Sequence, residues 1–115
     1  MVFPRSSAGD VELALRRDLA AAFRLAAQYG WQDQLATHMS VRLPGGDPRF
    51  LINPYGLFFD EITASSLVIV DAAGNVLSPT PQRVNKAGFI IHSAIHGARD
   101  DAQCVIHLHL SLIHI

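Results

Sequence analysis

Histidine is the residue type that most strongly suggests chemistry in this 115-residue sequence, since five of its six histidines fall between His92 and His114. His107 and His109 stand two residues apart in the run 104–109, which has the composition of a strand. Alternate residues of a strand point to one face, so both imidazoles can converge on one ion. Neutral imidazole is a good ligand for zinc and related divalent metals. The alternative interpretation is a pair of solvated or hydrogen-bonded strand histidines. His114 falls on the opposite face if the strand continues.

His92 and His96 form a second pair, four residues apart, and therefore share one face of a predicted helix. This spacing can hold a metal, but no glutamate accompanies it as in the zinc-protease motif. The sequence favours a polar helix edge that lines a cleft or an interface. Cys104 is predicted to be a buried strand residue, because no neighbouring residue type would activate its thiol.

Hydrophobic periodicity and turn residues define the elements that must position these histidines. A first helix is predicted over 11–29, with Asp10 as its N-cap and Gly30 as its stop. Asn85 caps a second helix that runs to Arg99. The strands are expected at 38–43, 50–53, 67–71, 75–77 and 104–109. The core-facing stripe of the first helix is Leu15, Leu19, Ala22, Phe23 and Ala26, and the apolar stripe of the second is Ala87, Ile91, Ala94, Ile95 and Ala98. This order predicts an α/β or α+β sandwich in which helices cover a sheet.

Composition excludes several classes of protein. Half of the residues are apolar and the net charge is −1, which gives no reason to expect nucleic acid or an anionic membrane as partner. Cys104 is the single cysteine, so no internal disulfide can form. No apolar run is long enough to cross a bilayer and the first residues lack the features of a signal peptide, so a cytoplasmic setting is expected. We expect a flexible lead-in over 1–9 and one domain over 10–115.

Seven segments, taken in order, resemble the class II aldolase/adducin family from about Val11 to His109. They are Thr37-His-Met-Ser-Val-Arg42, Phe50-Leu-Ile-Asn-Pro-Tyr-Gly56, Glu61-Ile-Thr-Ala-Ser65, Leu67-Val-Ile-Val-Asp71, Asn85-Lys-Ala-Gly-Phe89, His92-Ser-Ala-Ile-His96 and Val105-Ile-His-Leu-His109. The resemblance implies a three-layer α/β/α sandwich around a mainly antiparallel sheet. It also implies a homo-tetramer with active sites between subunits.

The resemblance assigns roles to individual residues. His107 and His109 would bind a divalent metal, most often zinc, with manganese or iron as alternatives. In the sugar-phosphate aldolases and epimerases of the family, such a metal polarises the substrate carbonyl and stabilises an enediolate. A third histidine ligand normally comes from a later strand, which this chain does not contain. Substrate-binding roles fall by resemblance on His38, Ser40, Tyr55, Gly56 and Asn85.

The sequence also departs from the family pattern. The aldolases carry a general-base glutamate nineteen residues before the first histidine of the strand pair, and Gly88 stands at that place. Tyr55 replaces a threonine, and His38 lies where an asparagine is common. The Asn-x-Ala-Gly-Phe segment is closer to the adducin head, a non-enzymatic branch. His92 and His96 are the remaining candidates for a base.

Two functions follow: a metal-dependent lyase-type enzyme acting on a small carbonyl compound, or a silent adducin-like module that acts by binding and assembly. An oxygen-using iron enzyme is a third. The apolar end 110–115 has no helix cap or stop, and we expect it to be a non-native end of a fragment; the alternative is a short protein whose last strand simply extends. We therefore expect weak metal binding or none, and no aldolase turnover, from these 115 residues alone.

Overall fold

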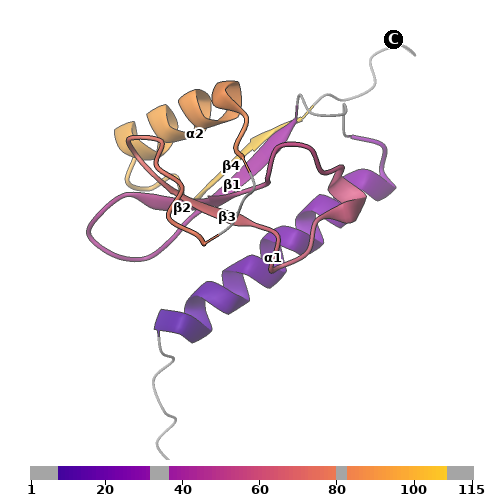
Figure 1. The fold of residues 1–115 in the computed structure, drawn as a ribbon, viewed down its shortest axis with the longest axis horizontal. Coiled ribbons are helices and arrows are strands. Elements are labelled where there is room, and N and C mark those ends of the chain that lie inside the picture. The colour runs from indigo at the N-terminus through magenta and orange to yellow at the C-terminus, as the bar shows by residue number, and fades with distance from the viewer. Residues whose placement is uncertain (1–7, 32–36, 80–82, 109–115) are drawn as a thin grey trace, which may run out of the picture.

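The computed structural model describes residues 8–31, 37–79 and 83–108. It contains two long helices and four strands together with one 3-10 helix (Figure 1). They are α1 (Ala8–Gln28), β1 (His38–Arg42), β2 (Arg49–Ile52), the 3-10 helix η1 (Phe59–Glu61), β3 (Val68–Asp71), α2 (Lys86–Ala98) and β4 (Cys104–His107).

The four strands form one antiparallel sheet in the order β3-β2-β1-β4. β4 comes last among these strands along the chain but lies against β1, and His107 is the register partner of His38. The strand predicted over 75–77 is reduced to a single bridge between Val70 and Val76. The sheet therefore brings the beginning of β1 and the end of β4 together.

α1 covers one face of the sheet and α2 the other, which gives three layers (Figure 1). The predicted stripe of α1 is confirmed, since Leu19, Phe23 and Ala26 are buried. They belong to an apolar cluster with Met39 and Leu51, which point to this face from β1 and β2. Burial of these side chains supplies most of the stabilisation on this side.

The face of α2 that packs on the sheet is polar, which differs from the expectation set by its apolar stripe. Gly88, His92 and His96 are the buried residues of this helix. Ile91 and Ile95 of the predicted stripe are 41% and 37% exposed. The reason is the strand surface below, where β1 presents the polar side chains of His38 and Ser40 to the helix.

Local signals at the helix ends act largely as predicted. Asn85 Oδ1 accepts a hydrogen bond from Ala87 N at 2.9 Å, which caps α2. Gly30 has a φ of 72° and ends α1. α1 begins at Ala8, earlier than the predicted start after Asp10. Asp10 therefore lies in the first turn, where its negative charge interacts favourably with the helix dipole.

The prediction that Cys104 is buried is wrong, because its side chain is exposed. β4 has only β1 as a neighbour in the described sheet, and its side chains alternate between an exposed and a covered face. Cys104 and Ile106 lie on the exposed side, whereas Val105 and His107 face α2. In the described residues, no helix is both long and apolar enough to cross a membrane.

Candidate functional site

Four histidines and a serine meet between α2 and the sheet, and we call this group the imidazole cluster: His38, Ser40, His92, His96 and His107. His38 and Ser40 are alternate residues of β1 and therefore share a face of the sheet, while His92 and His96 lie one turn apart on α2. The two-residue spacing on β1 and the four-residue spacing on α2 thus place side chains in the same buried region between the helix and the sheet.

Hydrogen bonds connect His38, Ser40, His92 and His96 in one continuous chain. His38 Nδ1 and His92 Nε2 are 2.9 Å apart. Ser40 Oγ lies 2.5 Å from His92 Nδ1 and 2.8 Å from His96 Nε2, so one hydroxyl bridges both helix histidines. His96 Nδ1 donates to the backbone carbonyl of Ala102 at 3.1 Å. The chain therefore runs from β1 through α2 to the loop before β4.

Burial keeps the helix histidines neutral. His92 is 0% exposed and His96 is 1% exposed. Desolvation, followed by Coulombic repulsion from His38, His96 and His107, lowers the pKa of His92 to about 3. Desolvation also lowers the pKa of His96, against the raising effect of its bond to Ala102 and with a lowering contribution from Arg42. Two neutral imidazoles consequently line the site at physiological pH.

His107 joins the cluster from β4. Its ring centroid lies 4.7 Å from that of His38, at a tilt of 49°. Its Nδ1 atom is buried, although the residue as a whole is half-buried. His109, its predicted partner, and His114 both lie outside the described residues. Within 8–31, 37–79 and 83–108, no group of three or more histidine, cysteine, aspartate or glutamate side chains is arranged to hold a metal.

Gly88 lies directly against His38. A Cβ atom at position 88 would stand 2.9 Å from His38 Cδ2, 3.1 Å from Cγ and 3.2 Å from Nε2. Real side chains essentially never approach so closely, so any residue larger than glycine would force the imidazole to move. The place at which the resemblance expects a glutamate is therefore filled by the His38 ring.

The other predicted substrate-binding residues lie apart from this chain of hydrogen bonds. Tyr55 and Gly56 are exposed in the loop after β2. Tyr55 N donates to Arg83 O, so this loop is joined to the segment that leads into α2. Asn85 serves as the α2 cap. No observation tests a substrate contact at these positions, and their roles stay predictions.

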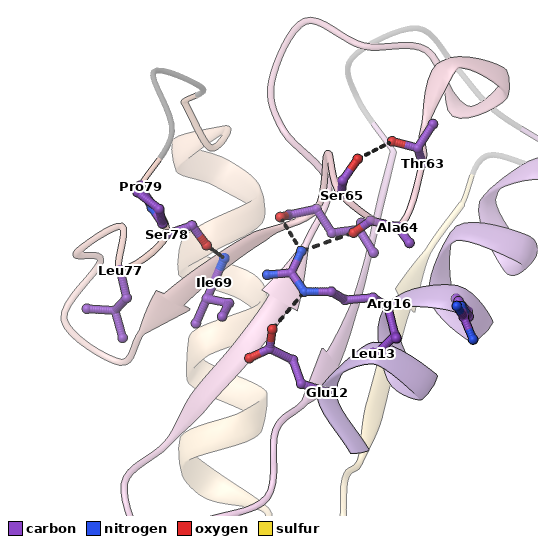
Figure 2. Close-up of a pocket in the computed structure, with 12 residues that line it drawn as sticks. Glu12, Leu13, Arg16, Thr63, Ala64, Ser65, Ile69, Leu77, Ser78 and Pro79 are labelled. Carbon is purple, nitrogen blue, oxygen red and sulfur yellow. Dashed lines mark hydrogen bonds and ion pairs between the residues drawn. The ribbon is translucent and has the colours of Figure 1, made fainter. Parts of the chain in front are cut away.

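An open cavity of about 730 Å³ lies elsewhere, between α1 and the segments 63–69 and 77–79 (Figure 2). Arg16 crosses its floor, bonded to Glu12 Oε2 and to the carbonyl oxygens of Ala64 and Leu67, each at 3.0 Å. Through these bonds the Arg16 guanidinium holds the turn at residues 64–67 against α1. The cavity contains none of the residues to which the sequence assigned a metal-binding, substrate-binding or catalytic role, and we assign it no chemistry.

Arg42 is a member of this neighbourhood that sequence reasoning missed. Its Nη1 donates to His96 O at 2.6 Å, and its Nη2 lies 4.0 Å from Asp100 Oδ1. This side chain ties the end of β1 to the end of α2. One signal was available, because Arg42 has the same strand parity as His38 and Ser40 and must share their face.

Comparisons with known proteins agree with this fold. The family model described as "Class II Aldolase and Adducin N-terminal domain" matches residues 17–112. An aldolase II superfamily protein from Pseudomonas syringae is 54% identical with a TM-score of 0.83, over 87% of this chain and 41% of that one. L-fuculose 1-phosphate aldolase from Glaciozyma antarctica PI12 is 34% identical with a TM-score of 0.85, over 96% and 46%. Alpha-adducin from Rattus norvegicus is 45% identical over 100 residues, which are 85% of this chain and 14% of that protein.

A three-layer sandwich around an antiparallel sheet defines an α/β/α domain of the class II aldolase type. The chain belongs to the class II aldolase and adducin family. It spans less than half the length of each of these three relatives. Enzymes and adducins both stand among them, so family membership alone leaves the function open.

Proposed function

We propose that this chain is the N-terminal part of a divalent-metal-dependent enzyme of the class II aldolase type, acting on a small carbonyl compound such as a sugar phosphate. The observation that carries the proposal is the position of His107. It stands on the face of β4 covered by α2, within the imidazole cluster, whereas a histidine on the opposite face of the strand would be exposed to solvent.

The donor chemistry of this place fits a metal such as zinc. Neutral imidazole nitrogen is a preferred ligand of such ions. His107 and, by resemblance, His109 would hold the ion, with zinc as the first expectation and manganese or iron as alternatives. When bound, the metal would supply Lewis-acid stabilisation of negative charge on a substrate oxygen. Assembly into a homo-tetramer, with sites between subunits, is part of the same proposal.

A second function is favoured by one specific observation, namely the absence of a carboxylate at Gly88. Glycine cannot move a proton, and an adducin-like module that acts through binding and assembly needs no general base. The chain is 45% identical to rat alpha-adducin, which supports this alternative. Its 54% identity to the aldolase II superfamily protein from Pseudomonas syringae supports the enzyme to a similar degree.

Metal content distinguishes the two functions. The complete product of the gene would be purified without chelators and its metal measured by mass spectrometry, beside a His107→Ala/His109→Ala variant. Stoichiometric metal that is lost in the double variant supports the enzyme. A folded protein that is metal-free and remains so after incubation with zinc, manganese and ferrous iron overturns it and leaves the binding module.

A further inference from the structure

We propose that the outer face of α2 is a contact between two copies of this chain, whose α2 helices lie antiparallel across a two-fold axis. This contact rests on the homo-tetramer that forms part of the proposed function, and it names the surface through which two of the subunits meet. The first supporting feature is the composition of the helix, because no aspartate, glutamate, lysine or arginine stands between Lys86 and Arg99.

The side of α2 turned away from the sheet is apolar between these two residues. α2 is the outermost described element on its side of the sheet (Figure 1). The exposed apolar side chains of this outer face are Ala87, Ile90, Ile91, Ala94, Ile95 and Ala98. The isoleucines at 90, 91 and 95 are 53%, 41% and 37% exposed. A helix that faces water normally carries charged side chains on that side, as α1 does with Arg17, Asp18 and Arg24. The outer face of α2 therefore has the composition of an interface.

The spacing of these side chains fits a second helix. Four of them follow one another at intervals of four, three and four residues, which is the heptad spacing of paired helices. They are Ala87, Ile91, Ala94 and Ala98. In an antiparallel pair centred between residues 92 and 93, Ile91 of one copy lies opposite Ala94 of the other, so a large side chain meets a small one. Ile90 and Ile95 flank the row on its two sides and meet each other across the axis.

Charges at the two ends of α2 are arranged against the helix dipole, which favours acidic groups at the start and basic groups at the end. Lys86 stands in the first turn, and Asp100 and Asp101 follow the C-cap Arg99. Arg99 is paired with Asp101 at 2.7 Å, whereas the Asp100 side chain is 98% exposed and 4.0 Å from Arg42. Within the described part of the chain, Lys86 makes no ion pair. In an antiparallel pair, Lys86 of each copy approaches Asp100 of the other, so the unfavourable ends become complementary.

A second copy matches this face in every pair that the two-fold axis generates. Alanine 87 meets alanine 98, isoleucine 90 meets isoleucine 95, and the basic start of one helix meets the acidic end of the other. An isologous contact needs this self-complementarity, because the same patch serves both subunits. The opposite face of the helix carries His92 and His96 of the imidazole cluster, so one helix stands between the contact and the site.

The test is the oligomeric state of the complete product of the gene, measured by analytical ultracentrifugation over a range of concentrations. Ile90→Asp places a carboxylate in the contact and should shift the assembly to smaller species, with a dissociation constant raised by about 100-fold or more. Leu25→Asp is the matched control, because Leu25 on α1 is also 53% exposed. This control should change the dissociation constant by less than about twofold.

A compensating pair of substitutions tests the antiparallel register. Ile95→Lys alone should weaken association as Ile90→Asp does. The double variant Ile90→Asp/Ile95→Lys should regain affinity to within about 10-fold of the wild type, because each new carboxylate then faces a new ammonium of the other copy. Residues five apart do not face each other on one helix, so a single chain does not explain this recovery.

An oligomer that folded Ile90→Asp leaves intact would overturn the α2 contact and leave the assembly in the proposed function standing. A wild type that is monomeric at every concentration would overturn both. A lower free energy of unfolding in Ile90→Asp with no change in mass would mean that another part of the same polypeptide covers the face, which also overturns the contact.

If Ile90→Asp does not fold, two exposed charges carry the same test. Lys86→Glu should weaken association, and Lys86→Glu/Asp100→Lys should restore it, whereas unchanged association in Lys86→Glu would contradict the antiparallel pairing. Metal content of each variant is measured alongside, because the contact predicts dissociation whether or not metal is bound. Loss of the contact is thereby distinguished from failure of the proposed metal site.

Discussion

The imidazole of His38 occupies the space that any side chain on Gly88 would enter, with 2.9 Å between His38 Cδ2 and the position of a Cβ at residue 88. The contact joins the first residue of β1 to the first turn of α2. It also fixes how closely the helix can lie on this face of the sheet. Glycine at 88 is therefore a packing requirement that no local helix or turn preference would indicate.

Gly88→Ala should destabilise the fold despite the better helix propensity of alanine. Propensity alone favours the change by about 1 kcal/mol in a helix interior. Overpacking against the His38 ring costs typically about 1–3 kcal/mol, so the net effect should be unfavourable or near zero. Urea unfolding measures it. In a His38→Ala background, which removes the ring, the same Gly88→Ala change should become stabilising, with a coupling of at least about 1 kcal/mol.

Gly97→Ala provides the control for this comparison of Gly88→Ala in the wild-type and His38→Ala backgrounds. Gly97 lies on the same helix, and a Cβ there meets nothing within 4 Å. The substitution should therefore stabilise α2 by up to about 1 kcal/mol in both backgrounds. Additive effects of Gly88→Ala and His38→Ala would show that the close contact has no energetic consequence.

Ser40→Ala should be among the more damaging single changes in the sheet. The variant leaves His92 Nδ1 and His96 Nε2 without the hydroxyl that bridges them in a buried place. Each buried polar atom that loses its partner costs about 1–3 kcal/mol, so a loss of roughly 2–5 kcal/mol is expected. Equilibrium unfolding of Ser40→Ala beside Ser93→Ala measures this. A loss below about 1 kcal/mol would mean that water replaces the hydroxyl.

Local sequence patterns were enough to predict the two long helices and the four strands of the sheet, although the strand expected at 75–77 is only a bridge. The period of 2 places His38 and Ser40 on one face, and the period near 3.6 places His92 and His96 on another. Local patterns could not predict that this face of β1 meets this face of α2, because the contact depends on how α2 packs on the sheet and on the strand register. His109, the predicted second metal ligand, lies outside the described residues, so the strand pair remains a prediction.

Two predictions of burial were wrong, for different reasons. Ile91 and Ile95 suggested the buried side of α2, whereas Cys104 was predicted to be buried because no neighbouring residue type would activate its thiol. Periodicity assumes that the apolar face is the one that packs. Here the polar face packs, because its imidazoles satisfy one another and Ser40, while Cys104 stands on the exposed side of β4.

Arg16 should matter for stability through hydrogen bonds rather than through its ion pair with Glu12. Its guanidinium holds two backbone carbonyls of the turn before β3 (Figure 2). Lysine cannot reproduce the planar fork, so Arg16→Lys should cost about 1–2 kcal/mol in urea unfolding. Glu12→Gln should cost less than about 1 kcal/mol, as expected for a half-exposed helix pair. Equal costs for the two variants would assign the stabilisation to the ion pair.

Acid should destabilise the metal-free protein well above the pH at which carboxylates titrate. The pKa of His92 is about 3 in the fold and 6.5 ordinarily, so between these values the unfolded chain binds more protons. Stability contributed by neutral His92 is thus fully present above about pH 6.5 and is lost progressively toward pH 3. His96, whose pKa is also lowered, acts in the same direction.

The maximum slope from one such group is about 1.4 kcal/mol per pH unit. Urea unfolding between pH 7 and pH 5, with EDTA present, measures the slope before Asp71 and Asp101, whose pKa values are lowered, begin to titrate. His38 on β1, His96 on α2 and His107 on β4 all repel a proton on His92, so no neighbour in the cluster compensates its charge. His92→Gln removes the titrating ring and should flatten the pH dependence. An unchanged slope in that variant would place the acid sensitivity elsewhere in the chain.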